Sequence, residues 1–240
     1  DVTTRTAGGG ITTTGALLDG TAELALGGVM RSLDLADRGG PFLVHFAEVN
    51  SRNGFFLLSR EPRPAFAWSD LVGRTVISFA EAPTPWQCML TVLRRNGVDP
   101  ARVRIERTLP LAEAIAAFWA GHADFLETGQ PFTEALLAEG AAHLVASMGQ
   151  ATGPVPFSSY MTTTKWIMDE REILGRFTRA LYRAQRWLAR AGPPSRLTFS
   201  ANGTVAVDST TPPLGEVAAT LAPSLFAGTI IDSGATKIRF

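Results

Sequence analysis

The chain has 240 residues, of which 45% are hydrophobic and 18% charged, and its 22 basic residues balance its 22 acidic ones. This composition is typical of a globular protein with a substantial core, and the neutral charge argues against a nucleic-acid-binding surface. The single cysteine, Cys88, excludes an internal disulfide and a cysteine-built zinc site. No apolar run approaches the roughly 20 residues that span a bilayer, and no secretory signal pattern opens the sequence. We therefore expect an intracellular protein or a trimmed mature chain.

Short apolar runs alternate with longer amphipathic segments, which predicts an α/β protein built from parallel βα units. In the first part we expect strands at residues 2–6, 24–27, 42–48 and 55–59, and helices at 12–18 and 30–37. In the second part we expect strands at residues 75–79, 103–107, 123–127, 143–147 and 158–164, and helices at 85–96, 111–120, 131–139 and 169–191. After Gly192 the signal weakens, and we expect hairpin-like alternation at 198–208, a short helix at 215–221 and a strand at 236–240.

Two stretches, residues 17–28 and 118–129, share one sequence pattern: the end of an apolar helix, a glycine, a short buried strand and a second glycine. The repeat predicts one αβ unit used twice, once in each of two lobes, with a ligand cleft between them. We place lobe 1 at residues 1–74, lobe 2 at 75–157, and a return to lobe 1 at 158–240, where the role of 193–240 stays open.

The first candidate binding loop is rich in glycine. Gly9 and Gly10 precede Thr12 at the start of a predicted helix, where bare amides and a hydroxyl favour an anion or a polar ligand. The loop lacks the lysine of a phosphate-binding P-loop. A plain βα turn with a threonine cap explains the same residues equally well.

The second candidate lies at the start of the helix predicted near residue 85. Thr84 suits the N-cap and Pro85 the first helical position, which leaves free amides at the positive end of the helix dipole. Trp86 offers a flat ring for stacking, and Gln87 donates and accepts hydrogen bonds. Core packing of the tryptophan is the alternative.

The remaining candidates follow predicted strands. Gly28 and Gln130 lie in the loops that close the two repeat copies, and Glu127 ends an otherwise apolar strand, so that it needs a partner or a ligand. Asn50, Ser51 and Arg52 follow another strand, and Arg52 is able to pair with an anion. Asn53 and Gly54 after them are explained by a turn.

The sequence offers little for catalysis. Cys88 lies early in a helix, whose N-terminus lowers a thiol pKa, but the three histidines fall in or beside strands. Neither a catalytic serine motif nor a set of residues with metal-ligand spacing is present. We therefore predict no catalytic residue, no metal and no cofactor.

Three stretches in this order carry a family resemblance: residues 17–30 (LLDGTAELALGGVM), 46–60 (FAEVNSRNGFFLLSR) and 70–79 (DLVGRTVISF). Together with residues 118–132 (FWAGHADFLETGQPF), they resemble the substrate-binding proteins of ABC importers for nitrate, sulfonates, taurine and thiamine-pyrimidine precursors. The resemblance covers roughly residues 1–190. It implies a type II periplasmic-binding-protein fold, whose two lobes close over a small molecule.

The resemblance also implies a function: capture of a small polar solute, anionic or heteroaromatic, for an ABC importer. It places Gly9, Gly10, Thr12, Gly28 and Asn50 at the ligand in lobe 1, Trp86, Gln87 and Glu127 in lobe 2, and Tyr160 near the crossover. The implied partners are the solute and the membrane subunits of the transporter, for a monomer located in the periplasm or cell envelope. Nucleic acid is not expected.

Two departures from the family affect this interpretation. Family members begin with an additional strand and helix, and residues 237–240 (KIRF) are a candidate for that absent strand. The part after Gly192 also differs from the usual helical ending. The competing functions are an enzyme on the same scaffold that uses Cys88, similar to desulfinases or thiamine-pyrimidine synthases, and a sensor domain.

Overall fold

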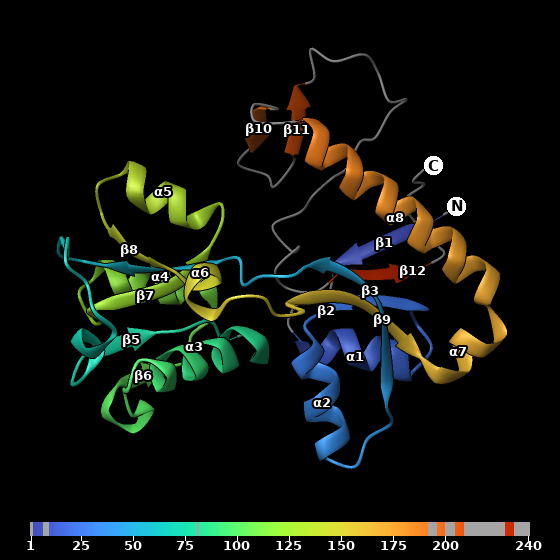
Figure 1. Cartoon of the computed structure of the whole chain (residues 1–240), viewed down its shortest axis with the longest axis horizontal. Helices are drawn as coiled ribbons and strands as arrows, with labels where there is room; N and C mark the ends of the chain where they lie inside the picture. Colours follow the sequence, from blue (N-terminus) through green and yellow to red (C-terminus); the bar gives the residue numbers. More distant parts are fainter. Residues whose placement is uncertain are drawn as a thin grey trace. The chain divides into compact units, whose positions relative to one another are not determined.

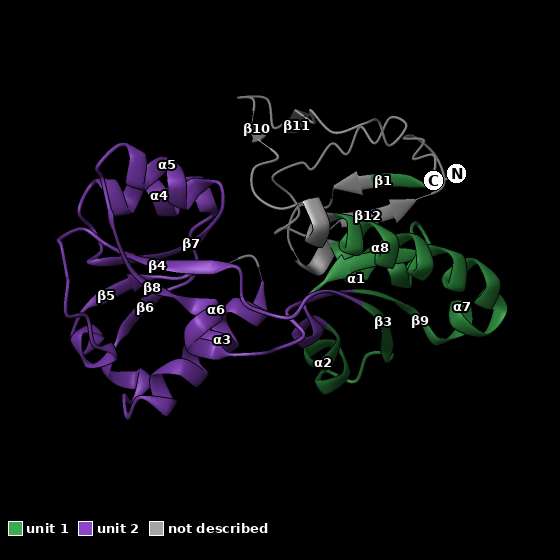
Figure 2. Ribbon diagram, turned by 45° about the horizontal axis from the view of Figure 1, so that its top comes forward, with its two compact units in different colours: residues 1–27, 32–47, 160–240 green, residues 28–31, 48–159 purple. Residues whose placement is uncertain are grey.

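The computed structural model describes residues 2–6, 10–80, 82–191, 196–199, 205–208 and 229–232. The chain divides into two compact units (Figure 2). Unit 1 comprises the described residues of 1–27, 32–47 and 160–240, and unit 2 comprises those of 28–31 and 48–159. Among the helices of the described ranges, none is both long enough and apolar enough to cross a membrane.

Unit 1 contains a sheet with the strand order β1 (Thr3–Thr6), β12 (Thr229–Asp232), β2 (Leu24–Gly27), β9 (Ser158–Thr163) and β3 (Leu43–Asn50). On one face, Leu17 of α1 (Gly10–Leu18) and Leu35 of α2 (Val29–Asp37) pack around Ala25. On the other face, the partners are α7 (Thr164–Asp169) and α8 (Arg171–Ala191), whose Leu174 and Phe177 join Leu24 (Figure 1). A separate hairpin pairs β10 (Arg196–Phe199) with β11 (Val205–Asp208).

Unit 2 contains a second sheet, with the order β6 (Arg104–Glu106), β5 (Thr75–Ile77), β7 (Phe125–Gly129), β4 (Phe55–Ser59) and β8 (His143–Ser147). β5 is parallel to β6 and β7, whereas β4 is antiparallel to β7 and β8. The helices of this unit are α3 (Pro83–Arg95), α4 (Leu111–Trp119), α5 (Phe132–Ala138) and α6 (Met148–Thr152), with 3-10 turns at Trp68–Leu71 and Pro100–Arg102.

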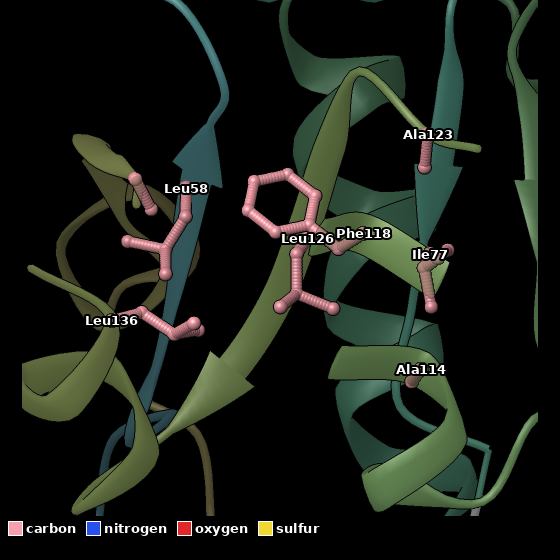
Figure 3. Close-up of a cluster of buried hydrophobic side chains, with 8 residues drawn as sticks. Leu58, Ile77, Ala114, Phe118, Ala123, Leu126 and Leu136 are labelled. Carbon is pink, nitrogen blue, oxygen red and sulfur yellow. The ribbon is translucent and has the colours of Figure 1, made fainter. Parts of the chain in front are cut away.

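One buried cluster explains how this second sheet is held. Leu58, Ile77 and Leu126 point from β4, β5 and β7 toward Phe118 of α4 and Leu136 of α5 (Figure 3). Burying a large apolar side chain stabilises a fold by about 2 kcal/mol, so this cluster fixes which face of each strand is apolar. Neighbouring residues along each strand point to the opposite face.

The repeated sequence pattern, residues 17–28 and 118–129, forms the same local structure in both units. α1 leads to β2 through Gly20, and α4 leads to β7 through Gly121. Both glycines adopt positive φ, 75° at Gly20 and 84° at Gly121, a conformation that side chains disfavour. The prediction of one αβ unit used twice is confirmed.

The structure differs from the predicted lobe division at the strand Phe55–Ser59. The sequence predicts this strand in lobe 1, but it lies in unit 2, between β7 and β8. Its continuous apolar sequence, FFLLS, suits a central strand that is buried on both faces. Residues 48–74, which the sequence predicts in lobe 1, therefore belong to unit 2.

Several elements differ in detail. Between the strands predicted at 143–147 and 158–164 the structure contains α6, whose N-cap Ser147 accepts a hydrogen bond from Gln150 N at 3.3 Å. The predicted long helix is preceded by α7, which begins at Thr164. The predicted helix at 215–221 and strand at 236–240, with the idea that 237–240 replaces an absent strand, lie outside the described residues. A different segment, β12, pairs antiparallel with β1 and β2.

Candidate functional site

Polar side chains gather where three strands of unit 2 end. β5, β6 and β7 run in the same direction, so their carboxyl ends share one edge of the sheet. Ser78 follows β5 and Arg107 follows β6, while Glu127 is the middle residue of β7, next after Leu126, which pairs with Ile77 of β5. Leu126 faces α4 and α5, so the alternation along β7 turns Glu127 to the other face, where α3 lies. The start of α3 adds Trp86 to this set.

Glu127 is the buried acid of the site. Its side chain is only 1% exposed, and Ser78 Oγ donates a hydrogen bond of 2.5 Å to its Oε2. Burial raises the pKa of Glu127 to about 7, against the opposing effects of the Ser78 bond, the Phe79 amide and the Arg107 charge. Its Oε1 has no hydrogen-bond partner among the described residues. The acid is therefore available to a further donor or acceptor.

Arg107 and Trp86 form the second half of the site. The guanidinium carbon of Arg107 lies 4.3 Å from the centre of the Trp86 ring, a cation–π contact. Burial lowers the pKa of Arg107, and the charge of Glu127 opposes this shift without cancelling it. Arg107 Nε is buried and has no partner among the described residues. Trp86 thus presents one ring face to its own arginine, and a solute has only the other face for stacking.

Thr84 and Gly28 form a tight contact beside this group. The N-cap of α3 is Ala82 and Pro83 takes the first helical position, so Thr84 is not the cap that its sequence context predicts. Pro83 displaces the helix start because its fixed φ suits the first turn. A Cβ built on Gly28 would lie 2.0 Å from Thr84 Oγ1 and 3.0 Å from Phe157 O. Gly28 is therefore required for close packing.

Asn50, Ser51 and Arg52 connect two passages of the chain within unit 2. The carbonyls of Asn50 and Ser51 accept hydrogen bonds from Phe157 N and Val155 N at 3.1 and 2.9 Å. Arg52 Nη1 donates to Gly149 O at 3.3 Å. In the structure these predicted ligand residues therefore connect two segments of unit 2 through hydrogen bonds. Asn53 Oδ1 accepts a hydrogen bond from Phe55 N at 2.8 Å, as expected of a turn.

The other predicted residues are dispersed. Gly10 and Thr12 lie in α1, whereas Gly9 and the side chain of Thr12 lie outside the described part of the chain. Gln87 is half-buried on α3, and Gln130 Nε2 donates to Glu134 Oε1 at 3.0 Å within its own loop. Tyr160 packs edge-on against Phe177, with ring centres 4.7 Å apart, in the core beneath α8.

The geometry does not support a catalytic Cys88. The thiol is buried, and burial raises its pKa, with smaller effects from Thr152, Glu127 and Asn53. A protonated thiol is a poor nucleophile, and none of these neighbours is a histidine. Among the described residues, no group of three or more potential ligands is placed to hold a metal ion.

Sequence reasoning missed Ser78 and Arg107. Both lie at or near the carboxyl ends of the strands predicted at 75–79 and 103–107, and neither is among the predicted binding residues. The signal was nevertheless present, because polar residues at the carboxyl ends of neighbouring parallel strands meet at one edge. The contact of Arg107 with Trp86 had no such signal, since it depends on how α3 packs on the sheet.

Comparison with known proteins gives two kinds of match. The model of the NMT1-like family matches residues 72–197, which is more than half of the chain. The chain is also similar to YtlA of Bacillus subtilis (strain 168), a protein named as a binding protein. The two are 27% identical over 190 residues, which cover 78% of this chain and 57% of YtlA.

Solved structures share the fold. The alkanesulfonate-binding protein SsuA from Xanthomonas axonopodis pv. citri matches with a TM-score of 0.63 and 22% identity over 76% of this chain and 62% of its own. The periplasmic aliphatic sulphonate binding protein SsuA from Escherichia coli matches with a TM-score of 0.62 and 23% identity over 76% and 64%. The fold is that of type II periplasmic binding proteins. The chain spans less than two thirds of each of these three relatives. Since the family model covers more than half of its residues, the chain belongs to the NMT1-like family.

Proposed function

We propose that this chain is a solute-binding protein, or the larger part of one. It captures a small polar solute, anionic or heteroaromatic, outside the cytoplasm and delivers it to an ABC importer. Membership of the NMT1-like family and the binding-protein names of its relatives support this class of function. The observation that carries the proposal is the group of Trp86, Arg107 and Glu127, in which one buried polar atom of Arg107 and one of Glu127 have no hydrogen-bond partner among the described residues.

These three residues suit a small organic anion. The Arg107 guanidinium offers its fork of donors to a sulfonate, carboxylate or nitrate group. The ring of Trp86 suits a flat or apolar body, as in most small-molecule sites. Glu127, with a pKa of about 7, keeps its proton between pH 4.5 and about pH 7, where a free carboxyl is already ionised, and in that range it can donate a hydrogen bond. A buried polar atom without a partner costs free energy, which a solute would recover.

An enzymatic function has less support. The Cys88 alternative needs an activated thiol, whereas burial raises the thiol pKa. The site offers groups that hold a molecule and lacks a nucleophile paired with a base. We therefore propose a binding role without turnover.

Thermal-shift measurements against alkanesulfonates, nitrate, pyrimidines and aromatic acids test the proposal. A solute that binds only the folded state at about one hundred times its Kd adds about 2.7 kcal/mol, or about 5 °C or more in Tm. Arg107→Met is expected to abolish the shift. Arg104→Met, which removes an exposed arginine three residues earlier at the start of β6, is the matched control and is expected to retain it. No shift with any solute, or equal shifts in both variants, would contradict the proposed site.

A further inference from the structure

The helix α8 of unit 1 has two very different faces. Its Leu174, Phe177 and Ala180 point into the unit, where Leu174 and Phe177 join the cluster around Leu24. The outward side carries arginine: the helix contains six arginines and one glutamate in 21 residues, although the whole chain is neutral. The positive charge is therefore concentrated on one element.

Four of these arginines form a continuous line, which we call the arginine stripe: Arg176, Arg179, Arg183 and Arg186. Steps of three, four and three residues keep them on one side of an α-helix, across roughly 15 Å of its length. All four side chains are exposed. The core residues Leu174 and Phe177 lie on the opposite side of the same helix, so the stripe faces away from the sheet.

The stripe is not used to hold the described structure together. None of its four arginines forms an ion pair with an acid among the residues that the structure describes. Arg186 makes a cation–π contact with Tyr182 of the same helix, with 5.8 Å between the guanidinium carbon and the ring centre. Neighbouring arginines repel one another, so their gathering on one line is costly unless an external anion compensates it.

Exposed aromatic side chains lie within the same outward part of α8. Tyr182 is 59% exposed and Trp187 is 37% exposed. Arginine forks match phosphate oxygens, and amphipathic rings of this kind settle at the level of lipid headgroups. A duplex nucleic acid offers phosphates too, but no apolar layer to receive these rings.

We propose that the arginine stripe of α8 is a docking surface for the anionic phospholipid headgroups of a membrane. Clusters of four or more basic residues on an amphipathic helix bind such surfaces through charge, and the attraction weakens with salt. The surface belongs to unit 1, so it does not depend on which solute the site in unit 2 holds.

Co-sedimentation of the chain with lipid vesicles tests this inference. We expect binding to vesicles of equal parts phosphatidylglycerol and phosphatidylcholine at low salt, and loss of binding at high salt or with pure phosphatidylcholine. R179E/R183E/R186E is expected to weaken binding by at least about tenfold, because each basic residue near an anionic surface contributes substantially. R179K/R183K/R186K is expected to retain most of it.

The matched control is R94E/R102E/R104E, which reverses three exposed arginines of unit 2 and changes the net charge equally. It is expected to bind nearly as the unchanged chain does, and circular dichroism melting verifies that both triple variants are folded. Equal loss in the two variants would show that net charge alone drives binding and would overturn the proposal. Absence of binding to anionic vesicles, or stripe-dependent binding to duplex DNA in preference to vesicles, would also overturn it.

Discussion

The two copies of the repeated αβ unit end differently, although their helices, glycine turns and strands correspond. β2 of unit 1 ends in Leu26 and Gly27 and leads to Gly28, whereas β7 of unit 2 ends in Glu127, Thr128 and Gly129. All of these residues are buried. The first copy uses its end for packing, because Gly28 lets Thr84 and Phe157 approach closely. The second copy instead buries a titratable carboxyl at this end, that of Glu127.

The largest expected effect is a difference in stability between alanine variants of Gly28 and Gly129, which occupy the same place in the repeat. A Cβ on Gly28 would meet Thr84 Oγ1 at 2.0 Å, whereas a Cβ on Gly129 would have no neighbour closer than 3.8 Å, the Phe55 ring. We expect Gly28→Ala to lower the free energy of unfolding by about 3 kcal/mol, at the upper end of the usual cost of overpacking. Gly129→Ala is expected to change it by less than about 1 kcal/mol.

Urea unfolding followed by circular dichroism measures both variants. Thr84→Ser within the Gly28→Ala background tests the mechanism, because removing the Thr84 methyl group gives the hydroxyl more freedom to turn away. Partial recovery is expected. Equal stability of the two alanine variants would mean that Gly28 is not closely packed.

Leu26 in the first copy corresponds to Glu127 in the second, and this difference predicts that stability depends on pH. The carboxyl of Glu127 ionises near pH 4.5 in an unfolded chain and near pH 7 in the folded one. Between these values the folded state holds more protons, so the free energy of unfolding falls as pH rises through this window and levels off above it. We expect a fall of about 3 kcal/mol from this group.

Glu127→Gln removes the titrating group while it keeps an acceptor for Ser78. It is expected to flatten the pH dependence between pH 4.5 and 7 and to be more stable than the unchanged chain at alkaline pH. Unfolding curves at several pH values measure this, with the exposed Glu139→Gln as control. A pH dependence that survives in Glu127→Gln would show that other groups cause it.

The sequence was sufficient to predict the α/β class, the repeat and Glu127 as an acid in need of a partner, because these depend on local periodicity and on the composition of one strand. The placement of Phe55–Ser59 was not predictable in this way, since an apolar strand fits the centre of either sheet. Tyr160 resembled a ligand residue only by its position near the crossover. Packing against Phe177, which is distant in sequence, decides its role.

The smallest expected effect compares two cation–π contacts, one in each unit. Arg107 and Trp86 in unit 2 are 4.3 Å apart and half-buried, whereas Arg186 and Tyr182 in unit 1 are 5.8 Å apart and exposed. A double-mutant cycle of Trp86→Leu and Arg107→Met is expected to give a coupling free energy of about 1 kcal/mol. The corresponding cycle of Tyr182→Leu and Arg186→Met is expected to give less than about 0.5 kcal/mol, because water competes for the exposed guanidinium. Coupling of equal size in the two cycles would mean that Trp86 does not hold Arg107 more firmly than a surface contact does. In that case the arginine would not be preorganised to meet an anionic solute, and affinity would include the cost of ordering it.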